Sequence, residues 1–342
     1  MKIDVVESSK SWLLVGALTS LIYPASGQSP PTLGIAMSNG ANITVSGTTG
    51  SVYVIQSTGS PAQSNSWASQ AFLQVSASNQ LFVDATALAP TSRFYRALLQ
   101  TPPTNGVFIP PNTFTLGSPT NEVGRMSDEG PQTIVTLSRG FWIAKYLVTQ
   151  GDYQAVIGAN PSGFPGDLSR PVESVTWLDA TNYCAALTQQ ELAAGRIPPG
   201  SHYRLPTEAE WECAARAGSS TRFYYGDDPG ATTLSCHAWY AAIGGATTHP
   251  VGLKEPNAWG LYDMEGNVWE WCQDCYGAYP GGFQTDPQGP DSNAAGVKVI
   301  RGGAWDAFDS DCRSARRMTE GASPFVKDFI IGFRVVLAID PS

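Results

Sequence analysis

The chain has 342 residues, of which only 14% are charged, and its formal net charge is −9. Nucleic acids and anionic membranes are bound through basic faces, so this acidic composition excludes both as partners. The length predicts two domains, ten tryptophans and 42% hydrophobic residues are enough for a packed core, and 35 glycines with 25 prolines indicate short elements joined by loops.

The first 27 residues have the pattern of an export signal. Lys2 and Lys10 precede an apolar run, Trp12–Ile22, which is too short to span a bilayer, and small residues follow it. Asp4 and Glu7 offset the positive charge, so an uncleaved anchor or a buried helix is the alternative. We expect residues 1–27 to be a signal peptide, the mature protein to be secreted or extracytoplasmic (periplasm or cell surface), and no membrane contact after cleavage.

Residues 30–100 are rich in Ser, Thr, Ala and Asn. Apolar and polar residues alternate in Ala41–Ser46 and Ser51–Gln56, with a turn at Asn39–Gly40, which predicts short antiparallel strands. The segment resembles the small immunoglobulin-like β-sandwich modules of secreted bacterial proteins. It carries no cluster of His, Cys or carboxylates, so we interpret it as a spacer or adhesive unit, followed by a proline-containing linker at 101–107.

Residues 108–342 are predicted to form the second domain. Strands are expected at Phe108–Gly117 and Pro131–Ala144, and helices are expected to begin at Thr149–Gln150, to run from Leu178 to about Ala193, and to span Leu205–Arg216. Thr149 and Thr207 occupy N-cap positions. Glu208 and Glu210 could suggest acid–base chemistry, but helix capping and a salt bridge to Arg204 or Arg216 is the favoured interpretation.

Six cysteines follow in this domain: Cys184, Cys213, Cys236, Cys272, Cys275 and Cys312. An even number in an exported protein predicts disulfides, with 15 pairings open. The Cys272–Cys275 pair has C-x-x-C spacing, which alone could indicate redox chemistry or half a zinc site. Because there is no second such pair and the three histidines are scattered, structural zinc is not expected.

The densest block of aromatic and acidic residues is Gly260–Trp271, which we expect to be a buried, pinned loop. Together with Arg204–Glu212, Arg301–Trp305 and Gly332–Val335, in this order, it resembles the sulfatase-modifying-factor family, whose founding activity is formylglycine generation. The resemblance runs from about Phe108 to Val336. It implies an α+β, C-type-lectin-like fold with a small twisted mixed sheet, a few helices and much irregular backbone.

The resemblance also implies a calcium site. Its ligands would be the Asp263 side chain and the backbone carbonyls of Met264, Gly266 and Val268, and hard oxygen ligands on a tight loop suit Ca²⁺. At the place of the family's other calcium site this chain has Cys236–Trp239, so a second ion is not expected.

Formylglycine-generating enzymes bind copper(I) through two cysteines in an Arg-Gly-Gly-Ser-Tyr-x-Cys-x4-Cys pattern. Here Cys312 matches the second cysteine and is the candidate catalytic residue, but Ala307 stands at the first. One thiolate cannot form a two-sulfur copper site, and a Cys272–Cys312 disulfide would be a simple use of the remaining thiol. Copper is therefore not expected, and the leading hypothesis is an exported binding or accessory member of the family.

Two alternatives remain open. The same fold serves as a display scaffold in proteins of diversity-generating retroelements, and here the Trp305–Ile330 surface would bind the ligand. The third hypothesis is a genuine protein-cysteine oxidase that makes formylglycine in sulfatases. The partner would be a protein or glycan ligand, or a sulfatase-like polypeptide, and the working face is expected to contain the following candidate ligand-binding residues: Trp269, Trp271, Trp305, Asp306, Phe308, Asp309, Asp311, Phe325, Lys327 and Phe329.

Overall fold

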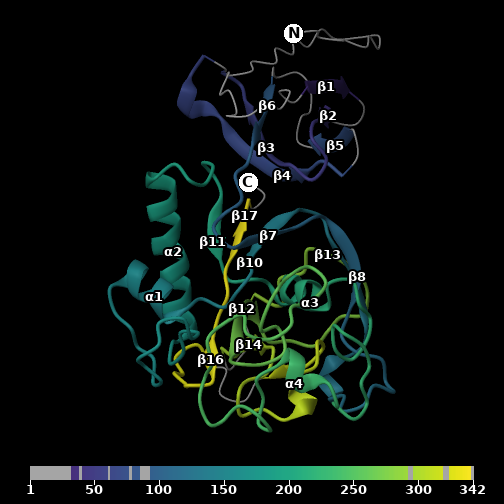
Figure 1. The fold of residues 1–342 in the computed structure, drawn as a ribbon. Helices are drawn as coiled ribbons and strands as arrows, with labels where there is room; N and C mark the ends of the chain where they lie inside the picture. Colours follow the sequence, from purple (N-terminus) through teal and green to yellow (C-terminus); the bar gives the residue numbers. More distant parts are fainter. Residues whose placement is uncertain are drawn as a thin grey trace. The chain divides into compact units, whose positions relative to one another are not determined.

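The computed structural model describes residues 32–37, 41–60, 62–76, 79–84, 93–291, 296–318 and 323–339 (Figure 1). The predicted signal peptide, residues 1–27, lies outside the described residues. The chain divides into two compact units: the first comprises the described parts of Met1–Thr101, Ala194–Ser201 and Ala338–Ser342, and the second comprises Pro102–Ala193 and His202–Leu337. In the part of the chain that the structure describes, no helix has the length and apolar composition needed to cross a membrane.

Where the structure describes it, the first unit contains two three-stranded antiparallel sheets. One has the order β1 (Thr32–Met37), β2 (Ala41–Ser46), β5 (Asn79–Asp84), and the other has the order β4 (Ala68–Gln74), β3 (Val52–Thr58), β6 (Phe94–Leu99). Buried residues from both sheets, among them Ile43, Tyr53, Leu73 and Tyr95, form one core cluster. The two strands predicted in this segment are present, whereas its assignment as an immunoglobulin-like sandwich stays a prediction.

The second unit consists mostly of short strands with few helices. Its helices are α1 (Gln150–Ile157), α2 (Trp177–Ala193), α3 (Glu208–Arg216) and α4 (Leu234–His237). The described residues of this unit form three sheets. The first has the order β11 (His202–Arg204), β17 (Val336–Ala338), β10 (Phe141–Ala144), β7 (Gly106–Ile109), and the second has the order β15 (Arg317–Met318), β14 (Lys298–Arg301), β12 (Trp269–Cys275), β16 (Ile331–Gly332). The third has the order β13 (Gly282–Thr285), β9 (Thr133–Leu137), β8 (Asn112–Leu116). Parallel pairing of β12 with β16 and of β13 with β9 makes two of these sheets mixed.

Each of the two long strands predicted at the start of this unit is split in the structure. The first becomes β7 and β8, because Pro110 and Pro111 between them have no N–H group to donate to a partner strand. The second becomes β9 and β10 on either side of Ser138–Gly140. There the Ser138 N–H donates to Asp286 Oδ1 (2.7 Å), a contact that replaces ladder pairing.

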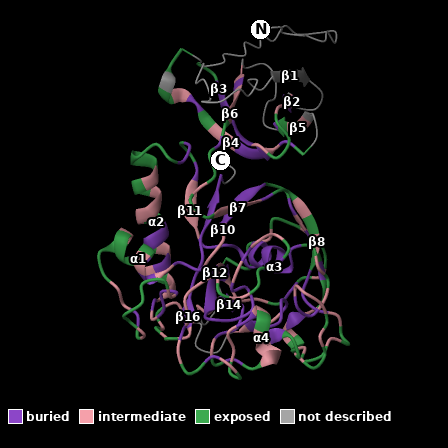
Figure 2. Ribbon diagram, viewed as in Figure 1, coloured by how far each residue is buried: buried purple, intermediate pink, exposed green. Residues whose placement is uncertain are grey.

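The helices begin where local capping chemistry predicts. The side chain of Thr149 accepts a hydrogen bond from the Asp152 N–H, and that of Thr207 accepts one from the Glu210 N–H, so both expected N-caps are confirmed. Helix α3 is buried along its whole length, whereas α1 and α2 keep one face exposed (Figure 2). Since α3 is enclosed by the sheets and loops around it, its charged side chains must find partners inside the protein.

The core of the second unit is built around β12, the C-terminal segment and α2. Tyr153 stacks on Tyr183 with ring centroids 5.5 Å apart, and both rings contact Phe333 edge-on. The same cluster of buried apolar residues continues to the tryptophans of β12 and to the segment after β14; it includes Val148, Val172, Val175, Leu205, Trp269, Trp271, Ile300, Ala304, Ala307, Cys312 and Ile331.

Candidate functional site

The block that begins at Gly260 is a buried loop that feeds into β12, and all its residues from Asp263 to Trp271 are buried. Asp263 and Asn267 adopt positive φ angles of 57° and 73°. The Asn267 side chain accepts from the His249 N–H and donates to the His249 carbonyl (3.0 Å each), and the Asn267 carbonyl accepts from the Trp305 N–H (2.9 Å). Asn267 therefore joins the loop to two segments that are distant in sequence.

The four predicted calcium ligands lie in this loop. Asp263 Oδ2 accepts from the Gly252 N–H (2.8 Å), Asp263 Oδ1 accepts from Asn267 Nδ2 (3.4 Å), and the Gly266 carbonyl accepts from the Val268 N–H (3.1 Å). Hydrogen bonds within the protein thus already engage two of the four predicted ligands, Asp263 and Gly266, and Met264 is fully buried. Among the described residues no group of three or more His, Cys, Asp and Glu is placed to hold a metal ion. Calcium binding at this loop stays a prediction.

The second block follows β14. Gly302 and Gly303 have φ angles of 101° and 77°. A Cβ atom at Gly303 would lie 2.9 Å from Cys312 Sγ, and one at Gly302 would lie 3.0 Å from the Trp211 ring. The paired glycines are therefore required both by the backbone conformation and by the close packing of Cys312 and Trp211.

Cys312, the candidate catalytic residue, lies at the bottom of this turn with no exposed surface. Burial, followed by the negative charges of Glu265, Asp311 and Asp309, raises the pKa of its thiol well above the ordinary value. Since the thiolate is the nucleophile and the metal ligand, a thiol in this environment is protonated and unreactive at neutral pH.

Ala307 occupies the position of the first cysteine in the family pattern. Its side chain is 8% exposed and belongs to the same apolar cluster as Cys312, and its carbonyl accepts from the Ala241 N–H (2.9 Å). A methyl group cannot coordinate a metal, so the residues present do not fit a copper(I) ion held by two thiolates.

All six cysteines are free thiols, so the expected disulfides, including Cys272–Cys312, are not formed in the structure. Cys272 and Cys275 lie on one extended strand, β12, with Cys272 buried and Cys275 partly exposed. Three steps along a strand place two side chains on opposite faces, which explains why the C-x-x-C spacing does not bring these sulfurs together.

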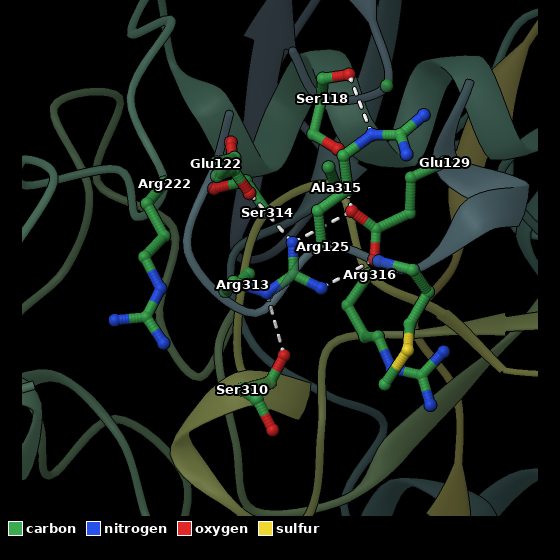
Figure 3. A network of polar contacts seen from close by, with 12 residues as sticks. Ser118, Glu122, Arg125, Glu129, Arg222, Ser310, Arg313, Ser314, Ala315 and Arg316 are labelled. Atoms are coloured by element: carbon green, nitrogen blue, oxygen red, sulfur yellow. Dashed lines mark hydrogen bonds and ion pairs between the residues drawn. The ribbon is translucent and has the colours of Figure 1, made fainter. Parts of the chain in front are cut away.

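Elsewhere in the second unit, buried arginines pair with buried glutamates. Figure 3 shows the pair that fixes the turn after Cys312: Arg313 Nη1 donates to Glu129 Oε2 and to Glu122 Oε1 (2.7 Å each), and Arg313 Nε donates to the Ser310 carbonyl (2.8 Å). Glu129 also accepts from Ser118 Oγ (2.7 Å). Although burial alone would raise the pKa of Glu129, the Arg313 guanidinium holds it below the ordinary value.

The glutamates of α3 take part in the same kind of contact. Glu210 caps the helix and accepts from Arg204 (Nη2–Oε1 2.8 Å), and Glu208 accepts from Arg317 (Nη2–Oε2 2.8 Å). The predicted salt bridge to Arg204 is therefore confirmed. Glu208 and Glu210 are 4% and 7% exposed and pair with arginines, which indicates a structural role.

The predicted ligand-binding residues fall into three groups. Trp269 and Trp271 are 2% and 0% exposed and lie in the core, where the Trp271 Nε1 donates to the Val175 carbonyl. Their burial corrects the expectation that they line the working face, because β12 is covered on both faces: Glu270 and Cys272, on the other face, are also fully buried. Three of the charged residues are engaged in ion pairs: Asp309 with Arg222, Asp311 with Arg316, and Lys327 with Asp179.

The third group is at the surface. Trp305 and Phe329 are stacked with ring centroids 6.0 Å apart, and Phe308 and Phe325 are 71% and 73% exposed. Asp306 is exposed as well. The structure thus brings Trp305 and Phe329 together, although more than twenty residues separate them in the chain.

Sequence reasoning missed one member of this aromatic group. Phe164 contacts both Trp305 (5.7 Å) and Phe329 (5.9 Å) edge-on. Its loop is held by Glu173, a fully buried carboxylate that accepts from the Gly163 and Phe164 N–H groups (3.0 and 2.9 Å). The available signal was a large aromatic residue inside the loop sequence Asn160-Pro-Ser-Gly-Phe-Pro-Gly166, where a turn alone requires no ring.

Comparison with known proteins gives a consistent result over the second unit. A family model for the sulfatase-modifying factor enzyme 1-like domain matches residues 95–339. The chain is 35% identical to the chaperone protein LppX of Paenibacillus barcinonensis, which covers 50% of this chain and 71% of that protein, and 37% identical to a formylglycine-generating enzyme of Streptomyces coelicolor, which covers 51% and 54%. It is also 35% identical to the inactive C-alpha-formylglycine-generating enzyme 2 of Mus musculus, with 51% of each covered. The chain therefore spans about half the length of these two formylglycine-generating-type relatives.

Two solved structures resemble the chain over about two thirds of its length. Treponema denticola variable protein 1 has a TM-score of 0.59 at 30% identity and covers 69% of this chain and 95% of that one. PvdO from Pseudomonas aeruginosa has a TM-score of 0.58 at 33% identity and covers 68% and 94%.

Proposed function

Because the chain belongs to the sulfatase-modifying factor enzyme 1-like family, we propose that it is a member that has lost the copper chemistry and serves as a binding or accessory protein for a polypeptide partner. The observation that carries this proposal is the pair of positions Ala307 and Cys312. One is a methyl group in the apolar core, and the other is a fully buried thiol whose pKa is raised. Neither can supply the thiolate that binding of copper(I) requires.

The names of the relatives indicate that membership of the family does not by itself imply enzymatic activity. They include a formylglycine-generating enzyme and an inactive one at nearly equal identity, 37% and 35%. Membership of the family is thus compatible with either activity state, and the residues at the site have to decide.

The remaining parts of the proposal concern where the protein acts and how it is built. We place it outside the cytoplasm after removal of residues 1–27, with an immunoglobulin-like sandwich as spacer in the first unit and a C-type-lectin-like domain in the second. The apolar run Trp12–Ile22 and the two antiparallel sheets of the first unit support this arrangement. N-terminal sequencing of the mature protein tests the cleavage: an intact Met1 would contradict it.

A second candidate function is ligand display through the Trp305–Ile330 surface. The exposed aromatics Phe308, Phe325 and Phe329 favour it, since large exposed apolar groups on a rigid scaffold are typical of recognition surfaces. Similarity to a protein named variable protein 1 supports it as well. In both candidates the protein binds a partner without catalysis. They differ in the partner, which is a polypeptide in the first candidate and a ligand of the Trp305–Ile330 surface in the second.

Copper titration with matched variants tests the proposal. Exposed Cys236 and partly exposed Cys275 offer thiols unrelated to the family site, so the informative comparison is between the wild type and Cys312→Ala. We expect both to bind copper(I) equally and neither to oxidise a cysteine in a sulfatase-derived peptide in the presence of O₂. Ala307→Cys restores both cysteines of the family pattern, and A307C/C312A is its control: any copper site that Ala307→Cys gains should be absent from the double variant.

The oxidase hypothesis predicts the opposite result. Tight copper binding by the wild type that Cys312→Ala abolishes, together with O₂-dependent oxidation of the peptide cysteine, would revive the oxidase hypothesis. Thermal unfolding of each variant controls for loss of fold.

A further inference from the structure

Cys275 and Lys298 lie directly opposite each other on two neighbouring antiparallel strands. In the ladder between β12 and β14, Cys275 is the partner of Lys298, and next to this pair the Tyr276 N–H donates to the Val297 carbonyl (2.9 Å). Residues that face each other across an antiparallel ladder direct their side chains to the same face of the sheet. The register of the two strands therefore brings a thiol and a primary amine together.

The amine is held beside the sulfur by several contacts. Lys298 Nζ donates to Cys275 Sγ (3.4 Å) and to the Gln273 carbonyl (3.1 Å). It also lies 4.0 Å from the centroid of the Trp177 ring, whose Nε1 donates to the Cys272 carbonyl (2.8 Å). Because these contacts fix the amine next to the thiol, a bond between nitrogen and sulfur needs only a small movement of the lysine side chain.

The pair can be reached by a small solute in the folded protein. Cys275 and Lys298 are both partly exposed, and the Cys275 thiol donates to the Asp291 carbonyl (3.9 Å) at the surface. Of the other five cysteines, four are buried and Cys236 is exposed. Access and the neighbouring amine together distinguish Cys275 from the buried thiols of the core.

We propose that Cys275 and Lys298 form a site of oxidative modification, at which a peroxide joins Cys275 Sγ to Lys298 Nζ through an S–N bond. In the first step hydrogen peroxide oxidises the thiol to a sulfenic acid, S–OH, and one water molecule is released. In the second step the neutral amine attacks the sulfur, the S–N bond forms, the S–O bond breaks, and the oxygen leaves as water with a proton from the nitrogen. Sulfenic acids condense with nitrogen in this way to sulfenamides.

The two steps balance without any further reactant. The sulfur loses two electrons, which the peroxide takes up, and each of the two peroxide oxygens leaves in a water molecule. The ammonium form of Lys298 first releases one proton to the solvent. A thiol reductant added later returns both side chains to their original state.

The crosslink has a physical consequence for the fold. It joins β12 to β14 and closes the chain between Cys275 and Lys298 into a loop, which restricts the unfolded chain as a disulfide does. The melting temperature should therefore rise by several degrees after treatment with peroxide and fall back after reduction.

Mass spectrometry of the full chain tests the proposal. The native protein is treated with hydrogen peroxide, its remaining thiols are alkylated, and it is digested with a protease that cleaves before aspartate. This cleavage places Cys275 in peptide 274–285 and Lys298 in peptide 291–305. We expect a joined species with the summed mass of the two peptides less two hydrogen atoms. Peptide 291–305 contains no cysteine, so a disulfide cannot produce this species.

Variants identify the nitrogen. Lys298→Arg keeps the positive charge, but a guanidinium stays protonated and does not attack the sulfur, so the joined species and the rise in melting temperature should both be lost. Lys327→Arg is the matched control at a lysine that pairs with Asp179, and it should keep both effects. Oxidation in concentrated urea should yield no joined species, because the two strands are then apart.

Three results would overturn the proposal. They are an unmodified Cys275 in the peroxide-treated native protein, a Cys275 oxidised to sulfinic acid beside an intact Lys298, and an equal rise in melting temperature in Lys298→Arg. The copper experiment concerns Cys312 and is decided separately, so neither outcome determines the other.

Discussion

Arg313 and Glu129 are separated by 184 positions in the chain, yet their side chains meet in a fully buried, doubly hydrogen-bonded ion pair. Arg334 and Glu270 form another such pair, 64 positions apart. Removing one member of a buried pair leaves the other charge without a partner and without water, which costs more than the pair itself contributes. Each charge can therefore be buried without a large cost in free energy only when the segment that carries its partner is also in place.

For Glu129→Gln we predict a loss of about 3 kcal/mol or more in the free energy of unfolding, because the Arg313 guanidinium stays buried with half its compensation removed. Lys327→Gln is the control: it removes an ion pair in which both side chains are substantially exposed, and stability should hardly change. Urea unfolding of the purified variants measures both. Similar midpoints for the two variants would show that the Arg313–Glu129 pair has no special role.

Asp274 provides a pH-dependent contribution. Burial, followed by the charge of Glu208, raises the pKa of Asp274 to about 8 in the folded protein. In an unfolded chain the pKa of an aspartate is about 4. Between these values unfolding releases a proton, so this residue makes stability fall as the pH rises from about 4 to about 8.

Asp274→Asn should remove that contribution. Asp274 Oδ2 accepts from the Glu208 N–H (2.8 Å), and the amide oxygen of asparagine can accept the same bond. We expect the variant to gain stability relative to the wild type as the pH is raised from 5 to 9, with the smallest difference at pH 5. Denaturant unfolding at pH 5, 7 and 9 measures this, and a constant difference across the three values would argue against a raised pKa.

Among the elements, helix caps could be predicted from the sequence, whereas contacts between segments distant in sequence could not. Thr149 and Thr207 were recognised as caps because a cap depends only on residues three positions away. Phe164 was missed because its contacts with Trp305 and Phe329 depend on how two distant loops fold over the same core. Trp269 and Trp271 were misplaced for a related reason, since their sequence does not show that other segments cover both faces of β12.

The segment Ala238–Gly244 packs closely against the turn that carries Trp305. A Cβ atom at Gly244 would lie 2.0 Å from the Trp305 carbonyl oxygen, so this loop and Trp305 fit together only with glycine there. The neighbouring Ala241 N–H donates to the Ala307 carbonyl, which holds the same two segments together.

Gly244→Ala should therefore displace the Trp305 backbone, with a destabilisation of about 1–3 kcal/mol. Gly230→Ala is a matched control, because its Cβ atom would meet only the methyl group of Thr232 at 3.3 Å. Thermal unfolding of both variants measures the effect. Equal melting temperatures of Gly244→Ala and Gly230→Ala would show that this contact does not set the placement of Trp305.

For the whole molecule, the sequence indicated the family, and the comparisons confirm it over residues 95–339. The substitution of the first copper cysteine by Ala307 was also visible in the sequence, because it lies within a short motif of fixed spacing. The state of Cys312 was not: its burial and raised pKa arise from Glu265 and the Gly302–Gly303 turn, which only the folded chain places around it. The expected disulfides were read from cysteine number alone, which carries no information about distance.

The buried arginines have a consequence for proteolysis. Arg301, Arg313, Arg317 and Arg334 are at most 1% exposed, whereas Arg139 and Lys327 are at the surface. Trypsin must take the basic side chain into its own pocket, so the peptide bonds after the four arginines can be cut only in molecules that have opened globally.

Digestion of the native protein should therefore proceed at two separate rates. Cleavage after Lys327 should be fast and insensitive to core substitutions, and cleavage after the four arginines should accelerate in Glu129→Gln in proportion to its larger unfolded fraction. Mass spectrometry of the fragments over time would resolve the two classes. Because these ion pairs keep the four arginines buried, the rate of cleavage after them reports the fraction of the protein that is unfolded.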